Sequence, residues 1–161
     1  METPDVIHNY PTVFGEGITE DDTKFVHLVF VGTTNFAVAF AMEAANVLHF
    51  PNFIKDKKLK TRITFIDKNA DVEKDEFITR NRHFFEVQSY RYQDLSGHGE
   101  TEDLIIESPS YFKNGAGDFL DVEFEFIKGD VFSRKVQDKI SEWADAKDEQ
   151  YLSIFLAQAN S

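Results

Sequence analysis

The spacing of apolar and polar residues predicts a strand, a helix and a second strand in the first half of the chain. A nearly all-apolar run at about 24–31 is typical of a central parallel strand that is buried on both faces. It leads into Gly32 and a short polar turn, after which apolar residues at helical spacing predict a helix over about 35–48. Pro51 ends this helix, because a proline disfavours helical geometry in the residue before it. Small side chains would let the helix lie close to a sheet; these are Ala37, Ala41, Ala44 and Ala45.

The rest of the chain continues this alternation. The apolar segment RITFID predicts a strand at about 62–67, and acidic residues in its first turns favour a helix over 69–82. The run at about 120–128 alternates between apolar and acidic residues, so we expect one face in solvent and a place near an edge of the sheet. A final strand is predicted at 151–158. It is preceded by a helix over 131–147, with apolar residues at helical spacing: Phe132, Val136, Ile140 and Trp143.

A longer insert separates the second helix from the third strand, at about 84–118. Its first part, 84–92, fits a short strand or an extended connector. The whole order predicts an α/β, Rossmann-like three-layer domain with a mostly parallel sheet. We expect residues 1–23 to be an N-terminal arm and 24–161 to be this domain within a larger protein. The predicted strands make about half of a Rossmann sheet, so more of that protein or another chain should cover the last strand.

Composition excludes several classes of function. The 161 residues suffice for one domain, and no apolar run approaches the roughly 20 residues needed to cross a bilayer. The absence of cysteine excludes disulfides and thiolate metal sites and fits a reducing compartment, so we expect a cytoplasmic location, including the cytoplasmic face of a membrane. A net charge of -12 opposes nucleic-acid binding, because phosphate backbones need clustered Lys and Arg.

The turn after the first strand matches a dinucleotide-binding fingerprint in part. It runs Gly32-Thr33-Thr34-Asn35-Phe36-Ala37, where the fingerprint is G-x-G-x-x-G/A. Gly32 would bring backbone N–H groups towards a pyrophosphate at the helix N-terminus, although any strand-to-helix turn favours glycine. Thr34 replaces the second glycine, and its side chain would either occupy pyrophosphate space or donate a hydrogen bond to phosphate. Ala37 is an accepted residue at the third position.

Acidic residues follow two of the predicted strands. Asp67 ends the second strand and is placed to accept hydrogen bonds from a ribose, or to cap the helix over 69–82. Lys68 beside it would instead favour a phosphate. Asp130 follows the third strand, on the side where ligands of open α/β sheets bind, and is also a candidate N-cap of the next helix.

No catalytic or metal-binding motif is visible. The five histidines form no i,i+4 pair and no HExxH motif, and His98 beside Glu100 is the best of the weak metal candidates. There is no G-x-S-x-G nucleophile turn. We therefore expect no enzyme and no metal; a dehydrogenase would need a substrate domain that these residues do not provide.

Four segments resemble a known family. HLVFVGTTNFAVAFAMEAANVLHFPN, TRITFIDKNAD, VEFEFIKGDVFS and YLSIFLAQAN are similar, in the same order, to the TrkA-N or RCK N-terminal domain of potassium-uptake and potassium-channel regulators. The resemblance covers about residues 24–158. It implies a module that binds NAD, NADH or an adenine nucleotide and passes its occupancy to a transporter or channel. It also implies a homodimer or higher homo-oligomer.

The resemblance assigns roles to particular residues. It implies phosphate contacts at Gly32 to Phe36, a ribose contact at Asp67, and an adenine pocket near Gly129 and Asp130. The expected cofactor is NAD or NADH, with ATP, ADP or AMP as alternatives. Thr34 leaves a second interpretation open, in which the scaffold has lost its ligand and serves as a protein-interaction or assembly module.

Overall fold

One six-stranded sheet organises the protein. The structure is a computed structural model, and it describes residues 18–88, 90–97, 105–107 and 121–156. The strands lie in the order β4-β3-β5-β2-β1-β6, and all neighbours are parallel except β3 and β4. The strands are β1 (Phe25–Val31), β2 (Thr61–Asp67), β3 (Tyr90–Asp94), β4 (Ile105–Glu107), β5 (Val122–Lys128) and β6 (Gln150–Leu156). The helices are α3 (Asn35–Val47), α4 (Asn52–Lys55), the 3-10 helix η1 (Lys57–Leu59), α5 (Ala70–Arg80), α6 (Arg82–Val87) and α7 (Arg134–Asp145).

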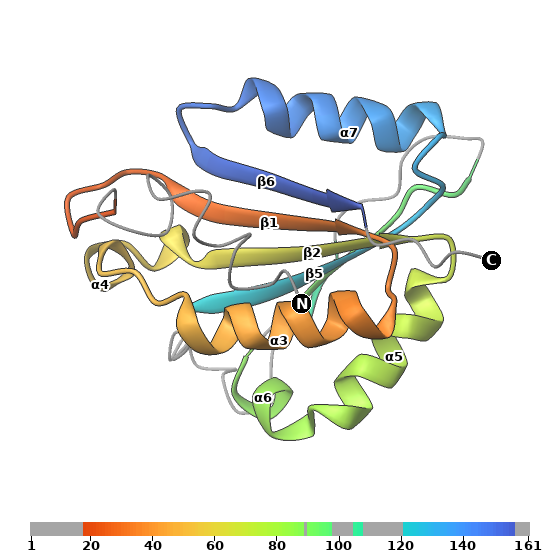
Figure 1. Ribbon diagram of the computed structural model, residues 1–161, viewed down its shortest axis with the longest axis horizontal. Helices are drawn as coiled ribbons and strands as arrows, with labels where there is room; N and C mark the ends of the chain where they lie inside the picture. The colour runs from red at the N-terminus through yellow and green to blue at the C-terminus, as the bar shows by residue number, and fades with distance from the viewer. Residues whose placement is uncertain (1–17, 89, 98–104, 108–120, 157–161) are drawn as a thin grey trace.

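Helices cover both faces of the sheet and complete a three-layer domain. Helices α3, α5 and α6 lie on one face, and α7 lies on the other (Figure 1). The strands β5, β2 and β1 have the order of the first half of a Rossmann sheet, and β6 adds one more strand beside β1, so the predicted fold class is confirmed. Strands β3 and β4 belong to the insert predicted at 84–118 and extend the sheet beyond β5.

Phenylalanine rings fill the core between the sheet and the helices on the face that carries α3. Phe65 of β2 lies at the centre, and its ring centroid is 5.6, 6.5 and 5.9 Å from those of Phe30, Phe124 and Phe126. Such ring pairs contribute roughly 0.5–1.5 kcal/mol each beyond the burial of their area. The same buried cluster takes small residues from α3, as predicted: Ala37, Ala41 and Ala44. This packing holds neighbouring strands in register.

The opposite face of the sheet carries charged residues that are paired. The carboxylate of Glu123 accepts a hydrogen bond from Arg62 Nε at 2.9 Å, and Arg91 Nε lies 3.3 Å from the same oxygen without hydrogen-bond geometry. Glu125 is 2% exposed and accepts from the Thr64 hydroxyl at 2.9 Å. The predicted edge position of this third strand is therefore wrong. β5 lies between β2 and β3, and side chains of these two strands compensate its buried carboxylates.

Two helix boundaries also differ from prediction. The helix expected over 69–82 stops at Arg80, because the backbone N–H and side-chain amide of Asn81 both donate to Phe77 O. The strand or extended connector expected over 84–92 is wrong for its first part, because the short helix α6 runs to Val87. The strand β3 begins only at Tyr90. At α7 the helix begins at Arg134 rather than 131, and Phe132 is 84% exposed before it.

Several predictions fall outside the described residues. These concern most of the N-terminal arm (1–17), the segment with His98 and Glu100, and the last residues of the final strand. Among the described helices, none has the length and apolar character needed to cross a membrane.

His27 is a buried base on β1, with no exposed surface. Its Nδ1 lies 2.7 Å from Gln150 Oε1, its Nε2 lies 2.7 Å from Thr64 Oγ1, and its ring meets Trp143 edge-on at 4.7 Å. Burial, followed by the positive charge of Arg62, lowers the pKa of His27 to about 3. The folded protein therefore keeps this imidazole neutral at pH values where the unfolded chain protonates it.

We predict that His27 makes the protein less stable in acid. Because its folded pKa lies below the ordinary value of 6.5, its contribution is complete above about pH 6.5 and is lost as the pH falls towards 3. In this window the wild type should lose up to about 1.4 kcal/mol more unfolding free energy per pH unit than His27→Gln. Urea denaturation at stepped pH measures the difference.

The matched control is His49→Gln. His49 is exposed, and its hydrogen bond to Asp121 raises its pKa. Its contribution is therefore present at low pH and lost as the pH rises through the folded pKa, with the opposite sign. Parallel curves for wild type and His27→Gln between pH 6.5 and 4 would contradict a neutral buried imidazole.

Candidate nucleotide-binding site

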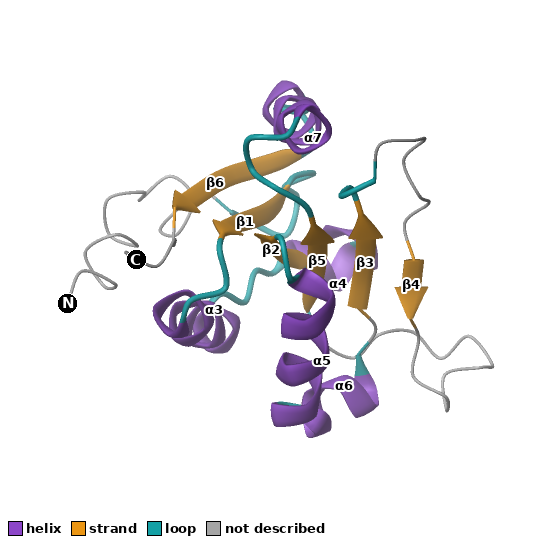
Figure 2. Cartoon of the chain, turned by 90° about the vertical axis from the view of Figure 1, so that its right-hand side faces the viewer, coloured by secondary structure: helices purple, strands orange, loops and turns teal. Residues whose placement is uncertain are grey.

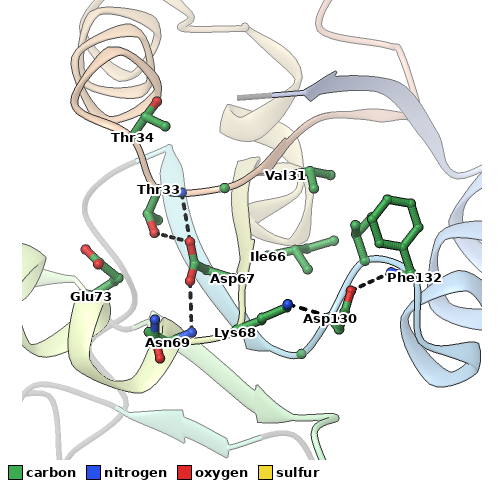
Figure 3. A pocket seen from close by; sticks show the side chains of 13 residues that line it. Val31, Thr33, Thr34, Ile66, Asp67, Lys68, Asn69, Glu73, Asp130 and Phe132 are labelled. Atoms are coloured by element: carbon green, nitrogen blue, oxygen red, sulfur yellow. Dashed lines mark hydrogen bonds and ion pairs between the residues drawn. The ribbon is translucent and has the colours of Figure 1, made fainter. Parts of the chain in front are cut away.

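A cleft of about 480 Å³ opens at the carboxyl ends of β1, β2 and β5 (Figure 3). The parallel register brings these ends together, since Val31 pairs with Ile66 and Asp67 pairs with Lys128. Helix α3 follows β1 on one face of the sheet, and α7 follows β5 on the other (Figure 1). The cleft thus lies at the edge where ligands of open α/β sheets bind, and its volume falls within the roughly 300–1,000 Å³ of small-molecule pockets.

Gly32 makes the sharp turn out of β1. Its φ of 104° lies in the left-handed region, which glycine adopts without the steric cost of a Cβ. Its N–H donates to Ile66 O at 2.8 Å and extends the pairing of β1 with β2 by one step. The positive φ therefore explains why the turn after β1 has a glycine at this position.

Thr34, which replaces the second glycine of the fingerprint, is the N-cap of α3. Its Oγ1 accepts from Ala37 N at 3.1 Å, and its side chain is directed away from Asp67 (Figure 3). The hydroxyl oxygen is thereby used by the helix, while its hydrogen can still be donated. Both sequence-based alternatives for Thr34, crowding a phosphate or donating to it, remain predictions.

Asp67 accepts three hydrogen bonds from the chain around it. Its Oδ2 accepts from the Thr33 backbone N–H at 3.1 Å and the Thr33 hydroxyl at 2.7 Å, and its Oδ1 accepts from Asn69 N at 2.8 Å (Figure 3). The last bond supports the start of α5, although Asn69 is the N-cap residue. A carboxylate offers about four acceptor positions, so Oδ1 keeps one for a ligand hydroxyl.

The turn keeps backbone donors beyond Thr33. Within the described residues, the structure gives no acceptor for the N–H groups of residues 34, 35 and 36 at the start of α3. These are the N–H groups that a helix leaves without intrahelical partners. Asp67 therefore occupies two donors of the turn, the Thr33 N–H and hydroxyl, but none of these three amides.

Lys68 and Asp130 close the far side of the cleft. Lys68 Nζ lies 3.4 Å from Asp130 Oδ2, and Asp130 Oδ1 accepts from Phe132 N at 2.8 Å. The Phe132 N–H, with the Lys68 charge as a further cause, lowers the pKa of Asp130 below its ordinary value. The predicted capping role of Asp130 is wrong, because Ser133 is the N-cap of α7.

Gly129 is needed for close packing. Its N–H donates to Asp67 O at 3.0 Å, and a Cβ at this position would lie 2.7 Å from Val136 Cγ2 of α7. Glycine therefore lets α7 approach the end of β5. This is a packing reason for the Gly129-Asp130 pair, alongside the adenine pocket that the resemblance implies.

Seven of the nine predicted site residues line this cleft. They are Gly32, Thr33, Thr34, Asp67, Lys68, Gly129 and Asp130. Asn35 lines a smaller groove between α3 and α5, and Phe36, 55% exposed, lies outside both.

The structure adds Glu73 to the predicted set. It lines the cleft from α5, and burial, followed by the charges of Asp67 and Glu76, raises its pKa. The available signal was its place in the first turn of the helix after β2, which faces the carboxyl ends of the strands. From the sequence alone, the acidic residues of this turn are explained by the helix dipole.

The charged side chains that line the cleft are mostly acidic. Asp67, Glu73 and Asp130 stand against Lys68 alone, which already pairs with Asp130. An anionic ligand would therefore depend on backbone amides, whereas ribose hydroxyls would find carboxylate acceptors. Within the described part of the chain, no three His, Asp or Glu side chains converge as a metal site requires.

Comparisons of the chain with protein-family models, curated proteins and solved structures found no significant match. The resemblance to TrkA-N and RCK domains stays a prediction, and the function has to be argued from the cleft.

We predict that Asp67 holds the turn after β1 in place. Asp67→Ala should lower the free energy of unfolding by about 2–3 kcal/mol, because three donors lose a charged acceptor. Thr33→Val should cost about 1 kcal/mol, because it removes only the hydroxyl bond. Chemical denaturation measures both values, and faster hydrogen exchange of the Thr33 amide should accompany the Asp67 change. Unchanged stability and exchange would show that this carboxylate does not restrain the turn.

Proposed function

We propose that this chain is a regulatory, non-catalytic domain that binds NAD, NADH or an adenine nucleotide. The observation that carries the proposal is the position of Asp67. Its carboxylate ends β2 beside the Gly32 turn and retains an acceptor position in a cleft of about 480 Å³.

The proposed partner is an ion-transport system, a potassium transporter or channel, and the proposed assembly is a homodimer or larger homo-oligomer. The sequence resemblance supports both proposals. Regulation would work by population shift, in which the nucleotide binds one arrangement of paired domains better than another. The cleft suits such coupling because the N-cap residues of α3 and α5, Thr34 and Asn69, line it together with the segment that precedes α7.

Two observations favour the alternative of a scaffold without ligand that mediates protein interactions. Asp67 already occupies the Thr33 N–H and hydroxyl. In addition, within the described residues β6 pairs only with β1, and it exposes Ile154 and Leu156 at 41% and 81%. An unpaired, charge-free strand edge is a surface that another chain can cover.

Calorimetry with NAD, NADH, ATP, ADP and AMP tests the proposal. We expect at least one ligand to bind with a dissociation constant below 1 mM, or about −4 kcal/mol. Asp67→Asn should weaken binding at least about tenfold, because the amide replaces an acceptor oxygen with a donor. The matched control is Asp71→Asn, an acid at the start of α5 that does not line the cleft. If all five ligands fail to bind at millimolar concentration, the alternative function is favoured.

Thr34→Gly tests the departure from the fingerprint. It restores the second glycine, and glycine at an N-cap costs only a few tenths of a kcal/mol. If the Thr34 side chain limits the space for a pyrophosphate, the variant should bind NAD more tightly while its affinity for AMP changes little. Equal NAD affinity in the two proteins would show that residue 34 does not restrict the site.

A further inference from the structure

A second cleft, of about 560 Å³, lies beside the candidate site. Leu95, Ser96 and Gly97 line it after β3, and the first residues of α7 line it from the other side. The segments after β3 and β5 lie next to each other at this end of the sheet (Figure 2). Lys68 and Asp130 line both clefts, so their ion pair stands between the two.

The two clefts have opposite charge. The second is lined by three cations, Lys68, Arg134 and Lys135, against the single carboxylate of Asp130. The first is lined by three carboxylates against Lys68 alone. In a chain of net charge -12, a cavity with an excess of cations is a local exception.

The cations of the second cleft are available to a ligand. In the part of the chain that the structure describes, Arg134 makes only an exposed ion pair of 3.9 Å with Asp138, of the kind that contributes little stability. Within the described residues, no carboxylate pairs with Lys135. Asp130, the one acidic group, already accepts the Phe132 N–H and faces Lys68.

We propose that the second cleft binds a phosphate group of the nucleotide whose ribose is bound by Asp67. This inference rests on the proposed nucleotide-binding function and specifies the ligand as a nucleoside mono- or diphosphate. Its ribose lies in the acidic cleft, and its phosphate extends past the Lys68–Asp130 pair to Arg134 and Lys135. In the first cleft the same phosphate would meet Asp67, Glu73 and Asp130, whose charges repel it.

The test compares adenosine and ADP by calorimetry on the full chain. Arg134→Gln/Lys135→Gln should weaken ADP binding at least about tenfold and leave adenosine binding unchanged, because only ADP carries the phosphate. The control double variant, Lys57→Gln/Lys58→Gln, makes the same change of charge on exposed lysines of η1, which line neither cleft, and should bind ADP like the wild type.

A titration with inorganic pyrophosphate, followed by amide NMR shifts, locates the phosphate without a nucleoside. We expect shifts at Ser96, Gly97 and residues 133–135. Shifts confined to residues 34–36 would place the phosphate at α3 and overturn the inference. Equal ADP affinity in wild type and Arg134→Gln/Lys135→Gln, with weaker binding in Asp67→Asn, would also overturn it and leave the proposed function standing. Absence of binding by adenosine, ADP and the four other nucleotides would defeat the two together.

Discussion

The carboxylate of Asp67 fixes the geometry at the carboxyl end of the sheet. Its bonds to the Thr33 N–H and hydroxyl, and to Asn69 N, tie the turn after β1 to the start of α5. These connections cross between two strands whose register is already set by phenylalanine packing beneath them. The position of the α3 start relative to β2, and with it the shape of the cleft, follows from this one side chain.

The same side chain has to serve two purposes if the domain binds a nucleotide. A ribose hydroxyl can use the remaining acceptor position of Asp67 without breaking any bond. A phosphate placed on Thr33 would have to displace Asp67 Oδ2 from both of its donors. Sugar binding is therefore compatible with the structure as it stands, whereas phosphate binding at this point of the turn requires rearrangement. The structure therefore favours binding of the ribose at Asp67 over binding of a phosphate at Thr33.

The sequence predicts an element correctly where neighbouring residues determine its burial. The prediction fails where residues distant along the chain determine it. The ranges of β1, α3 and β2 follow from continuous apolar runs and from Gly32, so prediction and structure agree within a residue or two. The place of β5 in the sheet depends on Arg62 and Arg91, which lie far from Glu123 along the chain. An alternating pattern records only that acidic residues share one face. The pattern does not show whether solvent or an arginine side chain compensates the charge of these residues.

The site shows the same division. Asp67 was identified because the end of β2 is a fixed position in this topology, but its bond to Thr33 spans 34 positions and leaves no local signal. The prediction that Asp130 caps α7 failed because Asp130 and Ser133 are both good N-cap residues, and only the turn between them selects Ser133.

The turn from Asp130 to Ser133 also affects how the two clefts are coupled. It places the Lys68–Asp130 pair between two clefts of opposite charge, directly before a helix on the other face of the sheet. A ligand that spans both clefts must rearrange or incorporate this pair, so its binding would act on β2 and on the start of α7 together. Ligand binding would then affect the helices on both faces of the sheet through one ion pair, without any change in the sheet itself.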